Sequence, residues 1–155
     1  MTANHPLLLV DDDEADVFIM KQALSHAGIE NPLLVVETGE EALDYLSGTG
    51  QFGDRQRHPL PALVFLDLKL PLLSGFDVLT WIRQTAELAA TVVVVLTSSE
   101  DQEDLKRAHR LGANSYLVKP SAAGELADQL VETARAFNRD WLAGRSQRHD
   151  TSDMK

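Results

Sequence analysis

The chain has 155 residues and a mass of 17.1 kDa, a size typical of a single domain. Hydrophobic residues make up 44% and charged residues 25%, which excludes low-complexity and fibrous proteins. The formal charge of -10 argues against nucleic-acid binding, and the absence of cysteine excludes disulfides, zinc-thiolate sites and thiol nucleophiles. Residues 1–10 lack a basic leader and run into four acids, so the sequence indicates no secretory signal or membrane span and predicts a cytoplasmic protein.

Five short apolar segments alternate with amphipathic stretches along the chain. Two of the segments end abruptly at acids and a third ends at a threonine, which is typical of buried strands. The predicted strands are residues 7–10, 31–37, 61–66, 91–96 and 114–118. Apolar stripes at helical spacing lie within residues 17–27, 42–46, 76–82, 100–111 and 121–141. The patterns Thr38-x-x-Glu41 and Ser99-x-x-Gln102 fit a capping box at a helix start, and Ser74-x-x-Asp77 is a weaker version.

This alternation predicts an α/β fold with a doubly wound, five-stranded parallel sheet in the order 2-1-3-4-5, of the flavodoxin-like type. Right-handed crossovers bring the carboxyl ends of the strands to one edge, where the functional residues are expected. The sequence further predicts one domain over residues 1–141, a mobile loop over residues 47–60, and a polar, disordered tail over residues 142–155.

Polar residues follow the predicted strands at this edge. Asp11 and Asp12 follow the first strand and Asp67 follows the third, so three carboxylates are expected to converge. Because like charges repel unless a cation intervenes, and because the ligands are all oxygen, the cluster suits Mg²⁺. The alternative is that the acids cap a helix or solubilise the surface. Thr97 and Lys119 follow two further strands and bring a hydroxyl and an ammonium group, which suit a phosphoryl group.

The order of these residues resembles the receiver domain of two-component response regulators. The likeness extends from residue 7 to about residue 137 and is carried by LLLVDDDE at 7–14, LDLKLPLLSG at 66–75, VLTSS at 95–99 and YLVKP at 116–120. The resemblance implies that Asp67 accepts a phosphoryl group and that Asp12 binds Mg²⁺ directly. It also implies that Asp11 helps mostly through water and that the Lys69 carbonyl is a further ligand.

The same resemblance gives roles to the remaining motif residues. Lys119 would neutralise phosphoryl oxygens, Thr97 would hydrogen-bond the phosphoryl group, Ser98 would be the small residue that admits it, Tyr116 would change rotamer as Thr97 moves, and the Lys119-Pro120 bond would be cis. The reaction implied is transfer from the phosphohistidine of a sensor histidine kinase to Asp67, followed by slow hydrolysis, so the chain is not expected to be an enzyme in the usual sense. Lys69 and Ser99 would set the lifetime of the phosphoryl group.

Four other functions share parts of this pattern. A haloacid-dehalogenase-type phosphohydrolase needs a second aspartate two positions after the nucleophile, where this chain has Lys69. A nucleotide- or flavin-binding domain needs a glycine-rich phosphate loop, where this chain has acids. A pseudo-receiver that binds partners without phosphorylation, and a phosphorelay intermediate, both remain alternatives that only chemistry separates.

Signal output is expected to pass through protein contacts, because only a short polar segment follows the last predicted helix. The helix over residues 100–111 offers few apolar residues and is expected to be a switch face. The last helix is long enough to overhang the sheet, and Phe137 and Trp141 near its end predict a homodimer or partner contact. The chain is similar to the stand-alone regulators that serve phytochromes and related hybrid kinases. This likeness is carried by the loop before the third strand, by residues 114–120 and by the late tryptophan.

Overall fold

The computed structural model describes residues 5–98, 101–119 and 123–136. The strands are β1 (Leu7–Val10), β2 (Leu33–Val36), β3 (Leu63–Asp67), β4 (Val92–Thr97) and β5 (Ser115–Val118). The helices are α1 (Glu14–His26), α2 (Gly39–Ser47), α3 (Gly75–Gln84), α4 (Gln102–Arg110) and α5 (Ala123–Ala136). All strand pairs are parallel, and the sheet has the order β2-β1-β3-β4-β5. The predicted fold class and strand order are therefore confirmed.

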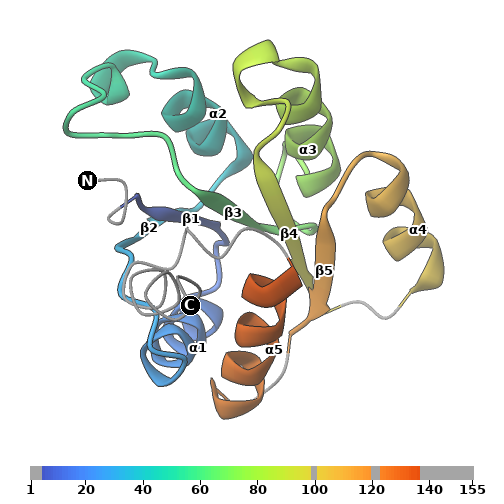
Figure 1. The fold of residues 1–155 in the computed structure, drawn as a ribbon. Coiled ribbons are helices and arrows are strands. Elements are labelled where there is room, and N and C mark those ends of the chain that lie inside the picture. The colour runs from blue at the N-terminus through green and yellow to red at the C-terminus, as the bar shows by residue number, and fades with distance from the viewer. Residues whose placement is uncertain (1–4, 99–100, 120–122, 137–155) are drawn as a thin grey trace, which may run out of the picture.

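The sheet lies between two layers of helices, with α1 and α5 on one face and α2, α3 and α4 on the other (Figure 1). Each face has its own apolar core because successive strand residues point to opposite sides. Leu8 and Val64 belong to the core under α2 and α3, whereas Leu7 and Phe65 belong to the core under α1 and α5, and all four are fully buried. This double burial explains why the strands read as continuous apolar runs rather than as alternating ones.

The helix starts differ in detail from the capping patterns in the sequence. Ser74 and Asp77 form a complete reciprocal capping box at the start of α3, although their pattern was the weakest of the three. At α2, the Thr38 hydroxyl accepts from the Glu41 backbone N–H at 3.0 Å, but the Glu41 carboxylate accepts from the N–H of Glu37 instead of Thr38. The prediction of a complete capping box at α2 is therefore wrong in its second hydrogen bond, because the Glu41 carboxylate bonds one residue further back than predicted.

The prediction of a capping box at Ser99 is also wrong. Helix α4 begins at Gln102 and its N-cap is Asp101, whose side chain accepts from the backbone N–H of Glu103 at 2.9 Å. Aspartate is as good an N-cap as serine, and here it lies directly before the first helical residue. The helix therefore starts two residues later than the predicted range, while Ser99 itself lies outside the described residues.

The long connection between α2 and β3, which the sequence predicts to be mobile, is bonded to the end of α2 by one arginine. Arg55 donates from its guanidinium to the carbonyl oxygens of Tyr45 (2.9 Å), Leu46 (2.8 Å) and His58 (3.1 Å). The ring of Phe52 packs edge-on against Tyr45 with ring centroids 5.1 Å apart. One arginine thus bonds to two carbonyls in the last turn of α2, and that of Tyr45 also accepts from the Gly48 N–H at 3.2 Å.

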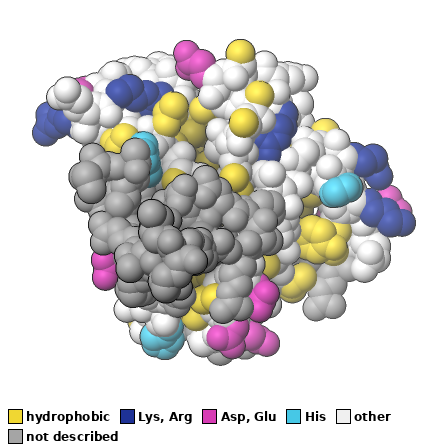
Figure 2. All heavy atoms as spheres, in the orientation of Figure 1, with side chains coloured by type: hydrophobic (Ala, Val, Ile, Leu, Met, Phe, Trp, Pro, Cys, Tyr) yellow, Lys and Arg dark blue, Asp and Glu magenta, His cyan; other side chains and the backbone are white. Residues whose placement is uncertain are grey.

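Charge is distributed unevenly over the helices. Helix α4 carries Lys106, Arg107, His109 and Arg110 in its sequence, and Figure 2 shows basic side chains gathered where this helix lies. Only Leu105 and Ala108 of α4 are buried, so most of the helix surface faces solvent. Its first turn carries Glu103 and Asp104, so the basic residues gather in the second half of the helix, in contrast to the net negative charge of the chain.

Several predictions concern segments that the structure does not describe. The predicted end of the last helix near Trp141, the contact residue Phe137 and the tail over residues 142–155 all lie outside the described residues, and α5 is described as far as Ala136. Pro120, and with it the Lys119-Pro120 bond, is also outside them. Within the described segments, no helix combines the length and hydropathy needed to cross a membrane.

Candidate functional site

The carboxyl ends of four strands bring the candidate site residues to one edge of the sheet. Asp11 directly follows β1, Asp67 is the last residue of β3, Thr97 is the last residue of β4, and Lys119 directly follows β5. The register aligns these ends, since Val10 pairs with Leu66 and the next residue, Asp67, pairs with Leu96. The parallel topology therefore collects residues that are more than 100 positions apart in the sequence, as in the 108-residue separation of Asp11 and Lys119.

Three carboxylates form a cluster at this edge. Asp11, Asp12 and Asp67 each offer one carboxylate oxygen, and these atoms lie within 4.8 Å of one another. The Asp11 side chain is 1% exposed and the Asp67 side chain 9%, whereas Asp12 is exposed. The donors are all oxygen, which suits hard divalent cations such as Mg²⁺ or Mn²⁺, and the exposed Asp12 leaves one side of the cluster open to water.

The environment of Asp11 favours a positive charge nearby. Burial raises the pKa of this carboxyl above its usual value, while the backbone N–H of Asp13, at 3.0 Å, and the Lys119 ammonium lower it. Desolvation is the larger effect, so burial destabilises the ionised form of Asp11, and a neighbouring cation offsets this destabilisation. This electrostatic balance is the one expected of a carboxylate that binds a cation.

The Lys119 ammonium contacts three carboxylates, two from this cluster and one from outside it. Its Nζ is 2.9 Å from an oxygen of Asp11, 3.2 Å from an oxygen of Asp67 and 2.7 Å from an oxygen of Asp16. Burial lowers the pKa of Lys119, but the hydrogen bonds to Asp16 and Asp11 outweigh this effect and raise it above its usual range. The lysine is therefore a permanent cation, and its backbone N–H is fixed by the Thr97 carbonyl at 2.8 Å.

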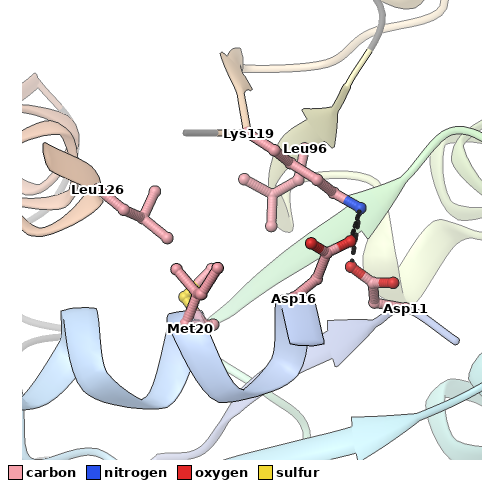
Figure 3. A pocket seen from close by; sticks show the side chains of 7 residues that line it. Asp11, Asp16, Met20, Leu96, Lys119 and Leu126 are labelled. Atoms are coloured by element: carbon pink, nitrogen blue, oxygen red, sulfur yellow. Dashed lines mark hydrogen bonds and ion pairs between the residues drawn. The ribbon is translucent and has the colours of Figure 1, made fainter. Parts of the chain in front are cut away.

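Asp16 is a site residue that the sequence analysis missed. It lies in the first turn of α1, where Asp13 caps the helix by accepting from the backbone N–H of Ala15 at 2.8 Å. The helix start thus directs Asp16 back over the strand ends toward Lys119 (Figure 3). An aspartate in a first helical turn is common because it suits the helix dipole, so its type and position carried no specific signal.

The other predicted site residues differ in their burial. Thr97 is fully buried, Ser98 is exposed, and Tyr116 is an exposed aromatic on β5. The Lys69 side chain is exposed, while its backbone N–H donates to an oxygen of Asp67 at 3.1 Å. The main chain of the loop after β3 therefore holds one oxygen of Asp67, and Lys119 holds the other.

The loop from Asp67 to α3 is tightly closed by Gly75. The backbone N–H of Gly75 donates to the Leu68 carbonyl at 3.0 Å, and a Cβ atom built on Gly75 would lie 2.3 Å from the Asp67 carbonyl oxygen. In the same loop Leu72 has a φ of 63° and is 92% exposed. A side chain at position 75 therefore cannot fit unless the backbone that carries Asp67 moves.

A Gly75→Ala variant is expected to lose about 2 kcal/mol of unfolding free energy and to displace Asp67, because the clash is with backbone atoms that cannot rotate away. Chemical denaturation measures the loss. The matched control is Gly124→Ala in α5, where a Cβ meets nothing within 4 Å and where alanine is expected to stabilise the helix by about 0.5 kcal/mol. Equal stability of the two variants would show that the tight approach at Gly75 is unimportant.

The sequence matches the family described as the response regulator receiver domain over residues 7–131. Among curated proteins, it is 36% identical to the probable methanogenesis regulatory protein FilR2 of Methanothrix harundinacea, covering 88% of this chain and 83% of the relative. It is 34% identical to the response regulator Rcp1 of Synechocystis sp., covering 88% of each. The chain thus matches these two relatives over most of their lengths.

Solved structures give the same result. The response regulator RPA3017 in red light signaling of R. palustris has a TM-score of 0.81 at 32% identity, covering 88% of this chain and 95% of the other. The phosphorylated cyanobacterial phytochrome response regulator RcpA has a TM-score of 0.76 at 28% identity, covering 84% and 91%. The Mn²⁺-bound form of Rcp1 has a TM-score of 0.73 at 32% identity, covering 89% and 94%. As the order of its motifs indicated, this chain belongs to the response regulator receiver domain family.

Proposed function

We propose that this chain is a phosphoacceptor: Asp67 takes a phosphoryl group from the phosphohistidine of a sensor histidine kinase, and the modified chain then signals through protein contacts. The proposal is carried by the surroundings of Asp67. Its carboxylate lies 3.2 Å from the Lys119 ammonium and within 4.8 Å of oxygens of Asp11 and Asp12. The phosphorylated state of the relative RcpA also supports it.

In the proposed reaction, an oxygen of Asp67 attacks phosphorus, a P–O bond forms, the P–N bond to the kinase histidine breaks, and the imidazole leaves. A divalent cation held by Asp11, Asp12 and Asp67, with the Lys69 carbonyl as a further ligand, would neutralise charge on the phosphoryl oxygens. Mg²⁺ is the ion proposed here, because the donors are carboxylates and the relative Rcp1 binds Mn²⁺, an ion of similar preference.

The remaining site residues would bind and sense the phosphoryl group. Lys119, already within reach of Asp67, would donate to a phosphoryl oxygen. Thr97 would donate its hydroxyl, and Ser98 is small enough to leave room for the group. Tyr116, exposed on β5, would change rotamer as Thr97 moves toward the phosphoryl oxygen, and this change would carry the signal to the surface around α4.

The decisive experiment is incubation of the chain with acetyl phosphate and Mg²⁺, followed by intact-mass measurement. The expected result is a gain of one phosphoryl group that requires the cation and disappears when EDTA is present. A chain that gains no mass under these conditions would instead be a pseudo-receiver, which binds its partners without being phosphorylated.

Lys69 is proposed to set the lifetime of the phosphoryl group. A Lys69→Ala variant is expected to dephosphorylate about threefold faster, a change of about 0.7 kcal/mol in the barrier, because the long side chain next to Asp67 would no longer limit the approach of water. The rate is measured by following the loss of the phosphoryl mass with time. Lys106→Ala on α4 is the control, and an unchanged rate for Lys69→Ala would refute this role.

The kinase partner is proposed to be of the phytochrome or a related hybrid type. The likeness to RPA3017, described in red light signaling, and to the phytochrome response regulator RcpA supports this, although the relative FilR2 is described as a probable methanogenesis regulatory protein. Phosphotransfer profiling against candidate kinases tests it: rapid transfer from a phytochrome kinase supports the assignment, and preference for another class overturns it.

Profiling should include histidine phosphotransfer proteins, because onward transfer would make the chain a relay intermediate. The cytoplasmic location predicted from the sequence is where such kinases would meet it.

A homodimer is proposed on the aromatic pair Phe137 and Trp141, which lie outside the described residues. Light scattering of the parent and of a Trp141→Ala variant tests this proposal, with and without acetyl phosphate. A dimeric parent and a monomeric variant are expected, because tryptophan is a typical interface anchor. A parent that stays monomeric in both conditions would remove the homodimer.

A further inference from the structure

Lys119 has three carboxylate partners, and one of them stands apart from the acid cluster. Asp11 and Asp67 belong to the group of oxygens that could hold a metal ion, and Asp16 does not. The contact with Asp16 is nevertheless the shortest of the three, at 2.7 Å against 2.9 Å and 3.2 Å. Figure 3 shows the lysine side chain reaching across the sheet edge to Asp16, at the start of α1, and to Asp11.

A cation in the acid cluster would compete with the lysine for the same carboxylates. The Lys119 ammonium lies 2.9 Å from Asp11 and 3.2 Å from Asp67, so a divalent ion bound to these residues would lie close to a second positive charge. It would repel the ammonium and also weaken its attraction to Asp11 and Asp67. Asp16 would keep its full negative charge for Lys119, since it lies outside that cluster.

The surroundings of the pair favour this anchoring. The Asp16 side chain is 28% exposed and that of Lys119 is 14% exposed, so the contact is only partly screened by water. Lys119 and Asp16 line a small cavity together with Met20, Leu96 and Leu126, which are apolar. Among the described residues that line this cavity, Asp16 and Asp11 are the acidic side chains that contact the ammonium.

We propose that Asp16 is a positioning residue: it keeps the Lys119 ammonium next to Asp67 when a divalent cation occupies the acid cluster. This inference rests on the proposed function, because it concerns the state in which the phosphoryl group is received. Without the Asp16 charge, binding of the cation drives Lys119 toward solvent, and the phosphoryl group then meets a site that lacks its ammonium donor.

A simpler role for Asp16 is to stabilise the first turn of α1 through the helix dipole. Glu14 separates the two roles, since it is acidic, lies in the same first turn and makes no ion pair with Lys119 among the described residues. Loss of its charge in Glu14→Gln therefore reproduces any effect on the helix dipole and leaves the lysine anchored. Asp16→Asn removes the charge of Asp16 at constant size, and Asp16→Glu retains it.

The test measures how accessible the Lys119 amine is to acetylation by a succinimidyl ester, using peptide mass spectrometry with and without saturating Mg²⁺. In the parent and in Glu14→Gln, Lys119 is expected to react slowly in both conditions. In Asp16→Asn it is expected to react slowly without Mg²⁺ and about tenfold faster with it, because a lysine without its anchor is displaced into water. Asp16→Glu is expected to restore protection.

Two outcomes would overturn the proposal: no Mg²⁺-dependent exposure of Lys119 in Asp16→Asn, or the same exposure in Glu14→Gln. Calorimetric titration with Mg²⁺ is run on each variant to show that the cation binds. A parent that binds no Mg²⁺ would contradict the proposed function itself, whereas a variant that binds Mg²⁺ and keeps Lys119 protected contradicts only the role of Asp16.

The same variants give a kinetic readout. At saturating Mg²⁺, phosphorylation by acetyl phosphate is expected to be about tenfold slower in Asp16→Asn than in the parent, close to the parent rate in Glu14→Gln, and recovered in Asp16→Glu. Equal losses in Asp16→Asn and Asp16→Glu would mean that the exact side chain, and not its charge, matters, which would contradict anchoring by charge.

Discussion

An Asp67→Asn variant is expected to accept no phosphoryl group from acetyl phosphate, with a rate at least about a thousandfold below that of the parent, because an amide oxygen is a far weaker nucleophile than a carboxylate. The asparagine is nearly the same size, and its single amide oxygen can accept from either the backbone N–H of Lys69 or the Lys119 ammonium, which in the parent bond to different oxygens of Asp67. Intact-mass measurement in the presence of Mg²⁺ detects the loss.

The control for this experiment is Asp44→Asn, which removes one exposed carboxylate from α2. It is expected to be modified as fast as the parent. A phosphoryl adduct on the Asp67→Asn chain would assign the reaction to another residue, and the neighbouring carboxylates of Asp11 and Asp12 would then be the first to examine.

Replacing Lys119 by methionine is expected to have the second largest effect. The substitution keeps the apolar part of the side chain and removes the ammonium group that pairs with Asp11, Asp16 and Asp67. In EDTA the variant is expected to lose about 3 kcal/mol of unfolding free energy, because breaking a largely buried ion pair leaves uncompensated charge. Phosphorylation by acetyl phosphate is expected to fall steeply as well.

Mg²⁺ is expected to return most of the stability lost by Lys119→Met, since a divalent ion neutralises two of the carboxylates that the lysine leaves. Urea denaturation of parent and variant, with Mg²⁺ and with EDTA, measures this. Lys106→Met, on the exposed face of α4, is the control and is expected to change stability by less than about 0.5 kcal/mol. Equal stability of Lys119→Met and the parent in EDTA would contradict the electrostatic account of the site.

The difference in unfolding free energy between Lys119→Met and the parent is also expected to depend on pH. Burial already raises the pKa of Asp11 in the folded parent, and removing the lysine raises it further. An acid whose pKa is higher in the folded state than in the unfolded state makes the fold less stable as pH rises above the unfolded value of about 3.9. In EDTA, the difference between Lys119→Met and the parent is therefore expected to widen between about pH 4 and pH 7.

The parts of this molecule that follow from chain order could be predicted from the sequence. Apolar runs that stop at Asp11 and Asp67 predict where two strands end, and a parallel topology places those ends at the same edge of the sheet. Thr97 and Lys119 followed from the same rule. The strand boundaries shifted by one or two residues, as at β3, which includes Asp67 itself.

Side-chain partners set by three-dimensional packing could not be predicted in this way. Asp16 contacts Lys119, which lies 103 residues away in the sequence, and an aspartate in the first turn of a helix does not by itself predict such a contact. Arg55 orders a loop whose glycines suggested mobility, because one guanidinium can satisfy several distant carbonyls. Asp101 caps α4 where Ser99 also fitted the local pattern, and local patterns do not rank such competitors.

The loop held by Arg55 has a practical use in engineering. Helix α2 starts at the edge of the sheet that carries the carboxylates and ends at the opposite edge, so the loop lies far from Asp67 (Figure 1). Arg55 secures its base by bonds to Tyr45, Leu46 and His58, and the exposed Gly50 begins a short 3-10 turn, Gly50–Phe52, where a Cβ would have no heavy atom within 4 Å. A fluorescent reporter domain inserted in this loop is expected to leave the chemistry at Asp67 intact, because the loop lies at the opposite edge of the sheet, and the reporter would follow the chain in living cells.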